Sequence, residues 1–155
     1  MKKILFVCLG NICRSCTAEE IMRTLIIKEG MENIIKVDSA GILSVHKGEL
    51  PDSRMRKHAS QRGYTLTHRS RPVTTMDFYD FDLIIGMDNQ NIDDLRDRAP
   101  GIDEERKIVC MTDFCQTMQV DHVPDPYYGG SQGFEHVLDI LEDACSGLIN
   151  KIKIE

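Results

Sequence analysis

The sequence lacks the excess of positive charge that a general nucleic-acid-binding protein needs. Its 155 residues carry 19 Lys and Arg against 25 Asp and Glu, a formal net charge of −6, whereas nucleic-acid binding calls for a basic face. No segment approaches the ~20 consecutive apolar residues of a membrane span, and there is neither an internal repeat nor a low-complexity stretch. These absences predict a cytoplasmic protein with no nucleic-acid partner and no membrane span.

Paired metal ligands are missing as well. No set of His and Cys residues has the spacing of two paired zinc ligands. The six cysteines belong to a chain that is too long and too regular for a disulfide-stapled mini-domain. We therefore expect reduced thiols, no metal and no cofactor, in a single domain that covers residues 1–155 and has a full core.

Strand and helix signals do alternate along the chain. The pattern predicts strands at 3–7, 34–39, 81–87 and 107–110, of which 3–7 and 81–87 are apolar runs. It predicts helices at 15–29 and 134–152 from the spacing of apolar residues, and at 53–62 and 88–98 from the cap and stop residues that bound them. This alternation predicts an α/β fold in which a parallel sheet carries helices on both faces. Ligands of such sheets bind outside the carboxyl ends of the strands.

The most informative segment is residues 4–15, Ile-Leu-Phe-Val-Cys-Leu-Gly-Asn-Ile-Cys-Arg-Ser. Cys8 ends an apolar strand, five residues separate it from Arg14, and a helix starts there. The N–H groups of a helix N-terminus and of a curled loop bind anions, and such a site favours the thiolate form of Cys8. The guanidinium of Arg14 matches two phosphate oxygens. We therefore expect this segment to bind phosphate and other oxyanions, with Cys8 attacking a bound phosphoryl group.

The motif Cys-x5-Arg-Ser of residues 8–15 resembles the signature loop of the cysteine-dependent protein tyrosine phosphatases. Its place after an N-terminal strand, with Gly10 and Asn11 in the loop, is similar to the low-molecular-weight branch. Asp-Ser-Ala-Gly at 38–41 resembles the end of that family's second strand, and Asp-Pro-Tyr-Tyr at 125–128 resembles its acid loop. The resemblance spans nearly the whole chain. It implies a four-stranded doubly wound sheet and hydrolysis of phosphotyrosine in proteins or peptides.

The resemblance also implies catalytic roles. Cys8 would be the nucleophile that forms a phosphocysteine, Arg14 would clamp the phosphate, and Asp125 would be the general acid and base. The phosphate-binding and supporting residues would be Leu9, Gly10, Asn11, Ile12, Cys13, Ser15, Ser39 and His68.

Simpler interpretations of the supporting residues stay open. Serine is a common N-cap, whereas the resemblance implies that Ser15 stabilises the Cys8 thiolate. Asn11 fits an ordinary turn, whereas the resemblance implies hydrogen bonds from it to Ser39 and His68. His68 fits an ordinary loop histidine, whereas the resemblance implies a pair with Glu19.

The substrate cleft is expected to include Ile12, Val45, Tyr127 and Tyr128. Relatives often have an aromatic residue where this chain has Val45, so one aromatic wall is expected to be missing. The resemblance implies a protective disulfide between Cys8 and Cys13. Cys16 replaces a usual proline, and we interpret it as neutral filler, with a second resolving thiol as the alternative.

Three other functions fit parts of the pattern. A thiol-coupled arsenate reductase would share the fold and the anion loop, but residues 82–97, where its further cysteines normally lie, contain none. A phosphoarginine phosphatase tends to have Thr at the position of Ile12. A non-catalytic phosphate-binding or redox-sensing module would not need Cys8, Arg14 and Asp125 together.

Overall fold

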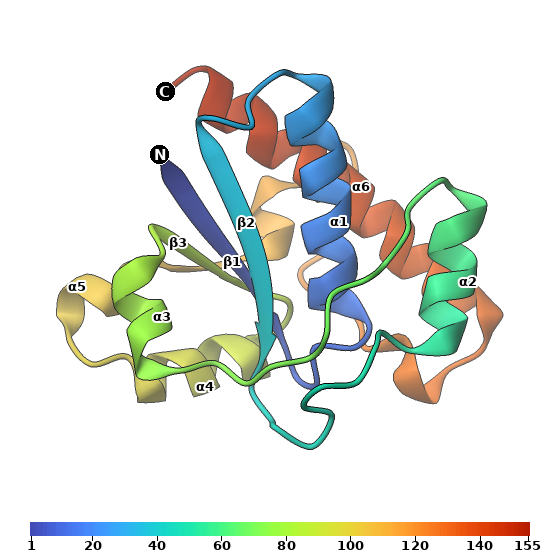
Figure 1. Ribbon diagram of the computed structural model, residues 1–155, viewed down its shortest axis with the longest axis horizontal. Helices are drawn as coiled ribbons and strands as arrows, with labels where there is room; N and C mark the ends of the chain where they lie inside the picture. Colours follow the sequence, from blue (N-terminus) through green and yellow to red (C-terminus); the bar gives the residue numbers. More distant parts are fainter.

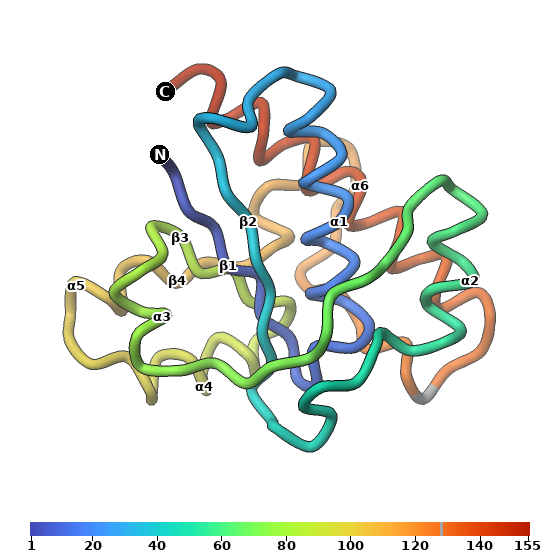
Figure 2. Tube along the Cα trace, viewed as in Figure 1, coloured from blue at the N-terminus to red at the C-terminus, as the bar shows by residue number. Residues whose placement is uncertain are grey.

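A four-stranded parallel sheet forms the centre of the computed structural model, which describes residues 1–127 and 129–155 (Figures 1 and 2). The strands are β1 (Lys2–Cys8), β2 (Ile35–Gly41), β3 (Leu83–Gly86) and β4 (Ile108–Cys110). Their order in the sheet is β2-β1-β3-β4. Every pairing is parallel, so all carboxyl ends lie at one edge. The fold class predicted from the sequence is confirmed.

Helices cover both faces of this sheet (Figure 1). They are α1 (Arg14–Lys28), α2 (Ser53–Gln61), α3 (Thr75–Asp80), α4 (Asn89–Arg98), α5 (Ile102–Glu105) and α6 (Ser131–Lys153), with 3-10 turns η1 (Met111–Phe114) and η2 (Pro126–Tyr128). The core cluster that contains α1, α2 and α6 lies on one face, and the cluster that contains α3 and α4 lies on the other. No helix among the described residues is long and apolar enough to cross a membrane.

β1 separates the two cores because its side chains alternate between the faces. Ile4 and Phe6 belong to the core beneath α1 and α6, whereas Leu5 and Val7 belong to the core beneath α4. All four side chains are fully buried, as expected for a central strand of a parallel sheet. The same alternation places Cys8, the last residue of β1, on the side of α1.

Two short helices were not predicted from the sequence. α3 and α5 have six and four residues, too few for a helical repeat of apolar positions. A local signal for α3 does exist, because Thr74 and Asp77 form a capping box at its start. Neither helix contributes to the pocket described below, so the expected position of the site is unaffected.

Candidate active site

The loop of residues 9–13 lies where β1 ends and α1 begins. Asn11 has a φ of 57°, in the left-handed region that asparagine adopts more readily than most residues. Gly41 at the end of β2 lets this loop pass closely, since a Cβ there would lie 3.1 Å from Leu9 O and from the carbonyl carbon of Gly10. A larger residue at 41 would therefore push the loop out of place.

The sulfur of Cys8 is buried and receives hydrogen bonds from within the loop. Cys8 Sγ lies 3.0 Å from Ser15 Oγ and 3.3 Å from the donating N–H of Asn11. Ser15 Oγ accepts from Asn11 Nδ2 at 2.8 Å, so its own hydrogen must point to another acceptor. Cys8 Sγ is closer than the alternative, Ala40 O at 3.4 Å. We infer that Ser15 donates to the sulfur and stabilises negative charge on it.

Asn11 uses its entire side-chain amide to fix this arrangement. Its Nδ2 donates to Ser15 and also to Ser39 Oγ at 3.0 Å, and its Oδ1 accepts from His68 Nε2 at 3.0 Å and from Arg71 N at 3.1 Å. The structure thus brings together the supporting residues expected from the sequence. Because Asn11 is fully buried, each of these bonds would be costly to lose.

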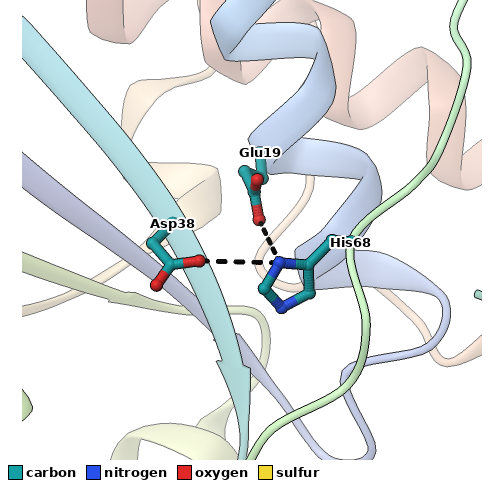
Figure 3. A group of neighbouring side chains, drawn as sticks. All are labelled: Glu19, Asp38 and His68. Carbon is teal, nitrogen blue, oxygen red and sulfur yellow. Dashed lines mark ion pairs between the residues drawn. The ribbon is translucent and has the colours of Figure 1, made fainter. Parts of the chain in front are cut away.

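Glu19, Asp38 and His68 form a cluster in which the two carboxylates face the imidazole ring (Figure 3), and His68 connects this cluster to Asn11. His68 Nδ1 lies 3.2 Å from Glu19 Oε1 and 3.5 Å from Asp38 Oδ1. The ligand atoms of the three residues lie within 4.8 Å of one another, close enough for a metal ion. However, Arg23 pairs with Glu19 at 2.6 Å and Arg71 pairs with Asp38 at 2.9 Å. The protein already balances these carboxylates, so we interpret the cluster as hydrogen-bond support.

Arg14 is almost completely buried and is held by groups from distant segments. Its Nη1 donates to Asp88 Oδ2 at 2.6 Å and to Val123 O at 2.9 Å, and its Nη2 lies 3.6 Å from Asp125 Oδ2. Burial alone would lower the pKa of Arg14, but Cys8, Asp88 and Asp125 raise that pKa above its ordinary value. The guanidinium is therefore a fixed positive charge.

Asp125 lies at the same pocket as Cys8, although the two residues are far apart in the sequence. Its Oδ1 accepts from Tyr127 N at 3.0 Å, which makes Asp125 the cap of η2. Its Oδ2 is the oxygen that faces Arg14. The carboxyl group is part-exposed, so it is accessible to water and to a molecule bound in the pocket.

These groups meet in a pocket of about 160 Å³ at the carboxyl ends of the strands. The pocket is lined by Cys8, Leu9, Gly10, Ile12, Cys13, Arg14, Leu43, Val45, His46, Asp125 and Tyr127. The expected cleft residues Ile12, Val45 and Tyr127 are therefore present, and the expected Tyr128 lies outside the described residues. Ser39 and His68 contact Asn11 and do not line the pocket.

Sequence reasoning assigned no role to His46, yet its ring forms one wall. The ring makes an edge contact with Tyr127, with centroids 6.1 Å apart and planes at 78°. It also lies over the loop, because a Cβ on Gly10 would be 3.0 Å from His46 Cδ2. An imidazole thus occupies the side of the pocket where Val45 led us to expect no aromatic ring. The one sequence signal was its position directly after Val45.

Cys13 and Cys16 differ in whether they are accessible from the pocket. Cys13 lines the pocket with Cys8, whereas Cys16 is buried outside it, with its Sγ 3.6 Å from Cys13 O. Burial raises the pKa of both thiols, and Cys8 raises both further; Asp52 acts in the same direction on Cys13. These shifts favour the neutral thiol form of Cys13 and of Cys16.

Known proteins are similar to this chain in sequence and in fold. The family model described as low molecular weight phosphotyrosine protein phosphatase matches residues 3–155. YfkJ of Bacillus subtilis, named a low molecular weight protein-tyrosine-phosphatase, is 40% identical over 156 residues, covering 100% of this chain and 98% of YfkJ. A crystal structure of a protein tyrosine phosphatase from Entamoeba histolytica is 50% identical with a TM-score of 0.95, covering 99% of this chain and 97% of that one.

A third relative carries a different activity in its name. The structure of DARP, a Drosophila arginine phosphatase, is 33% identical to this chain with a TM-score of 0.91, and the match covers 99% of this chain and 98% of the DARP chain.

The fold and the cysteine at the base of the loop after β1 define the class of this protein as a cysteine-dependent phosphatase. The chain belongs to the low molecular weight phosphotyrosine protein phosphatase family.

Proposed function

We propose that residues 1–155 form a single catalytic domain that hydrolyses phosphotyrosine in proteins or peptides through a phosphocysteine on Cys8. The observation that carries this proposal is the grouping of Cys8, Arg14 and Asp125 around one pocket. Ser15 donates to the nucleophilic sulfur, and Arg14 is a fixed cation beside it. Cys8 would be the nucleophile, Arg14 the phosphate clamp and Asp125 the acid, and this chemistry requires no metal or cofactor.

The reaction would proceed in two displacements. Cys8 Sγ attacks phosphorus in line, the bond from phosphorus to the tyrosine oxygen breaks, and Asp125 gives its proton to that oxygen. Asp125 then accepts a proton from water, which attacks phosphorus and breaks the P–S bond. Ser15 would stabilise the departing thiolate. Arg14 and the loop N–H groups would hold the phosphate oxygens throughout.

The walls of the pocket favour an aryl ester. Leu9, Ile12 and Tyr127 add apolar surface to the lining of the pocket that holds the buried Cys8. A tyrosine side chain is long enough to reach the sulfur and gains ring contacts on the way. A serine ester would have to pull polar peptide backbone against those walls, at the cost of unpaired hydrogen-bonding groups. We therefore expect a wide preference for phosphotyrosine over phosphoserine.

Phosphoarginine is the rival substrate, because a relative named an arginine phosphatase shares the fold. A phosphoguanidinium group carries N–H donors that need partners once they leave water. Ile12, at the loop position where that branch tends to have Thr, is buried and has no acceptor in its side chain. We expect phosphoarginine to be the poorer substrate for this reason.

The substrate assignment is tested by kcat/KM for phosphotyrosine, phosphoserine and phosphoarginine versions of one peptide, with inorganic phosphate as a competitive inhibitor. The phosphotyrosine peptide should be the best of the three, and arsenate reduction, run as a control, should be undetectable. An Ile12→Thr variant should narrow the gap between phosphotyrosine and phosphoarginine. Preference of the unaltered protein for phosphoarginine would refute the substrate assignment and leave the chemistry of Cys8 standing.

Mild peroxide should inactivate the protein reversibly. Peroxide oxidises the Cys8 thiolate to a sulfenic acid, and a neighbouring thiol then forms a disulfide with release of water. Cys13 shares the pocket with Cys8 and Cys16 does not, so the expected link is Cys8–Cys13, reversed by dithiothreitol. Peptide mass mapping checks the pairing, with Cys13→Ser and Cys16→Ser as matched variants. Loss of reversibility in Cys16→Ser alone would show that Cys16 is the resolving thiol.

A further inference from the structure

A basic hollow is lined by residues of α2 and of the start of α6. These two segments lie at the lower right of Figure 1. The volume of the hollow is about 370 Å³. The lining consists of Arg54, Lys57, His58, Gly129, Gly130, Ser131 and Phe134. Three of these side chains are basic and none is acidic, on a protein whose formal net charge is −6. A local basic surface on an acidic protein is a feature that needs explanation.

Arg54 connects this hollow to the catalytic pocket. Its Nη2 donates to Tyr127 O at 2.9 Å, and its guanidinium carbon lies 5.4 Å from the centre of the Tyr127 ring and 5.0 Å from that of Phe134. Tyr127 lines the catalytic pocket and Phe134 lines the hollow. Arg54 therefore contacts one residue of each site, so the two sites are neighbours.

The surplus positive charge of the hollow resides on Lys57. Asp52 pairs with Arg54 at 3.0 Å, and Glu135 pairs with His58. Lys57 is exposed, and no described residue forms a hydrogen bond or ion pair with it. The hollow thus has one ammonium group available to an external anion, beside a guanidinium that is already fixed in place.

We propose that the hollow binds an acidic group, a carboxylate or a second phosphate, on a residue that flanks the phosphotyrosine of the substrate. This inference rests on the proposed function. An extended peptide advances roughly 3.4 Å per residue, so a side chain one to three positions from the phosphotyrosine can reach a neighbouring site that Arg54 also contacts. Lys57 is then a specificity-determining residue for the reaction at Cys8.

The test uses a peptide with one phosphotyrosine in a neutral sequence and a single Glu moved from three positions before it to three positions after it. We expect kcat/KM to rise up to about fivefold at one or two positions, the scale of an exposed ion pair. The gain should shrink as salt is added, because exposed charges are screened. Phosphoserine in place of Glu at the best position shows whether a carboxylate or a phosphate binds better. A flat response at every position would overturn the subsite.

Two charge reversals locate the effect. In Lys57→Glu, the Glu-containing peptide that the unaltered protein prefers should become a poorer substrate than the neutral peptide. Lys36→Glu makes the same change of charge at an exposed site on β2 outside both cavities. It should keep the preference for the Glu-containing peptide. An unchanged preference in Lys57→Glu would overturn the subsite and leave phosphotyrosine hydrolysis intact. Failure to hydrolyse any of the phosphotyrosine peptides would overturn the proposed function and the subsite with it.

Discussion

Replacing Cys8 with Ser is expected to reduce turnover by several orders of magnitude while the pocket still binds phosphate or vanadate. The alcohol of serine is a far weaker nucleophile than a thiolate when no base stands beside it. The only neighbours of Cys8 Sγ among the described hydrogen bonds are Ser15 Oγ and the N–H of Asn11, and neither can accept a proton from a weak acid. The measurement is kcat for an aryl phosphate, together with an oxyanion titration by calorimetry.

A matched control for this change is Cys110→Ser. Cys110 ends β4 at the same edge of the sheet and is part-buried, but it does not line the pocket. It should keep wild-type turnover, and circular dichroism should show the same fold for both variants. If Cys8→Ser, correctly folded, kept near-wild-type turnover, the phosphocysteine mechanism would be wrong.

The part of the site that the sequence predicts best is the part that is contiguous in the chain. Cys8 and Arg14 are linked by a short loop between a strand and a helix, so their positions follow once β1 and α1 are recognised. β1 is an apolar run, and α6 has a clear repeat of apolar positions. These signals, with the family resemblance, were sufficient for the sheet and for the location of the pocket.

Contacts between distant segments were harder to predict. Asp88 pairs with Arg14, yet in the sequence it is only an N-cap residue at the start of a polar helix. The pairing depends on β3 lying beside β1, with Gly86 opposite Val7. This register places Asp88, two residues after the end of β3, next to the start of α1, where Arg14 lies. Periodicity within one segment cannot reveal the order of strands in a sheet. The contact between Arg14 and Val123 O was missed for a different reason, because residues 111–130 have no periodic pattern that would indicate their structure.

Asp125→Asn should reduce kcat/KM for phenyl phosphate by roughly 10²–10⁴-fold, the usual contribution of a positioned general acid. Asn keeps an oxygen to accept from Tyr127 N, the bond that caps η2, but its amide has no acidic proton to give. A phenol with a high pKa leaves poorly without that proton, whereas p-nitrophenol leaves readily as its anion. The loss for p-nitrophenyl phosphate should therefore be much smaller.

The quantity to compare is kcat/KM, because it reports the steps up to formation of the phosphocysteine and is unaffected by the later hydrolysis of that intermediate. A series of aryl phosphates with different leaving groups should give a steeper dependence in Asp125→Asn than in the unaltered protein. Asp121→Asn is the matched control, since Asp121 is exposed in the same segment and pairs only with His122 among the described ion pairs. It should leave the dependence unchanged. Equal losses of kcat/KM for good and poor leaving groups in Asp125→Asn would contradict the role of general acid. Asp125 would then be a positioning residue that orients the guanidinium of Arg14 through their contact at 3.6 Å.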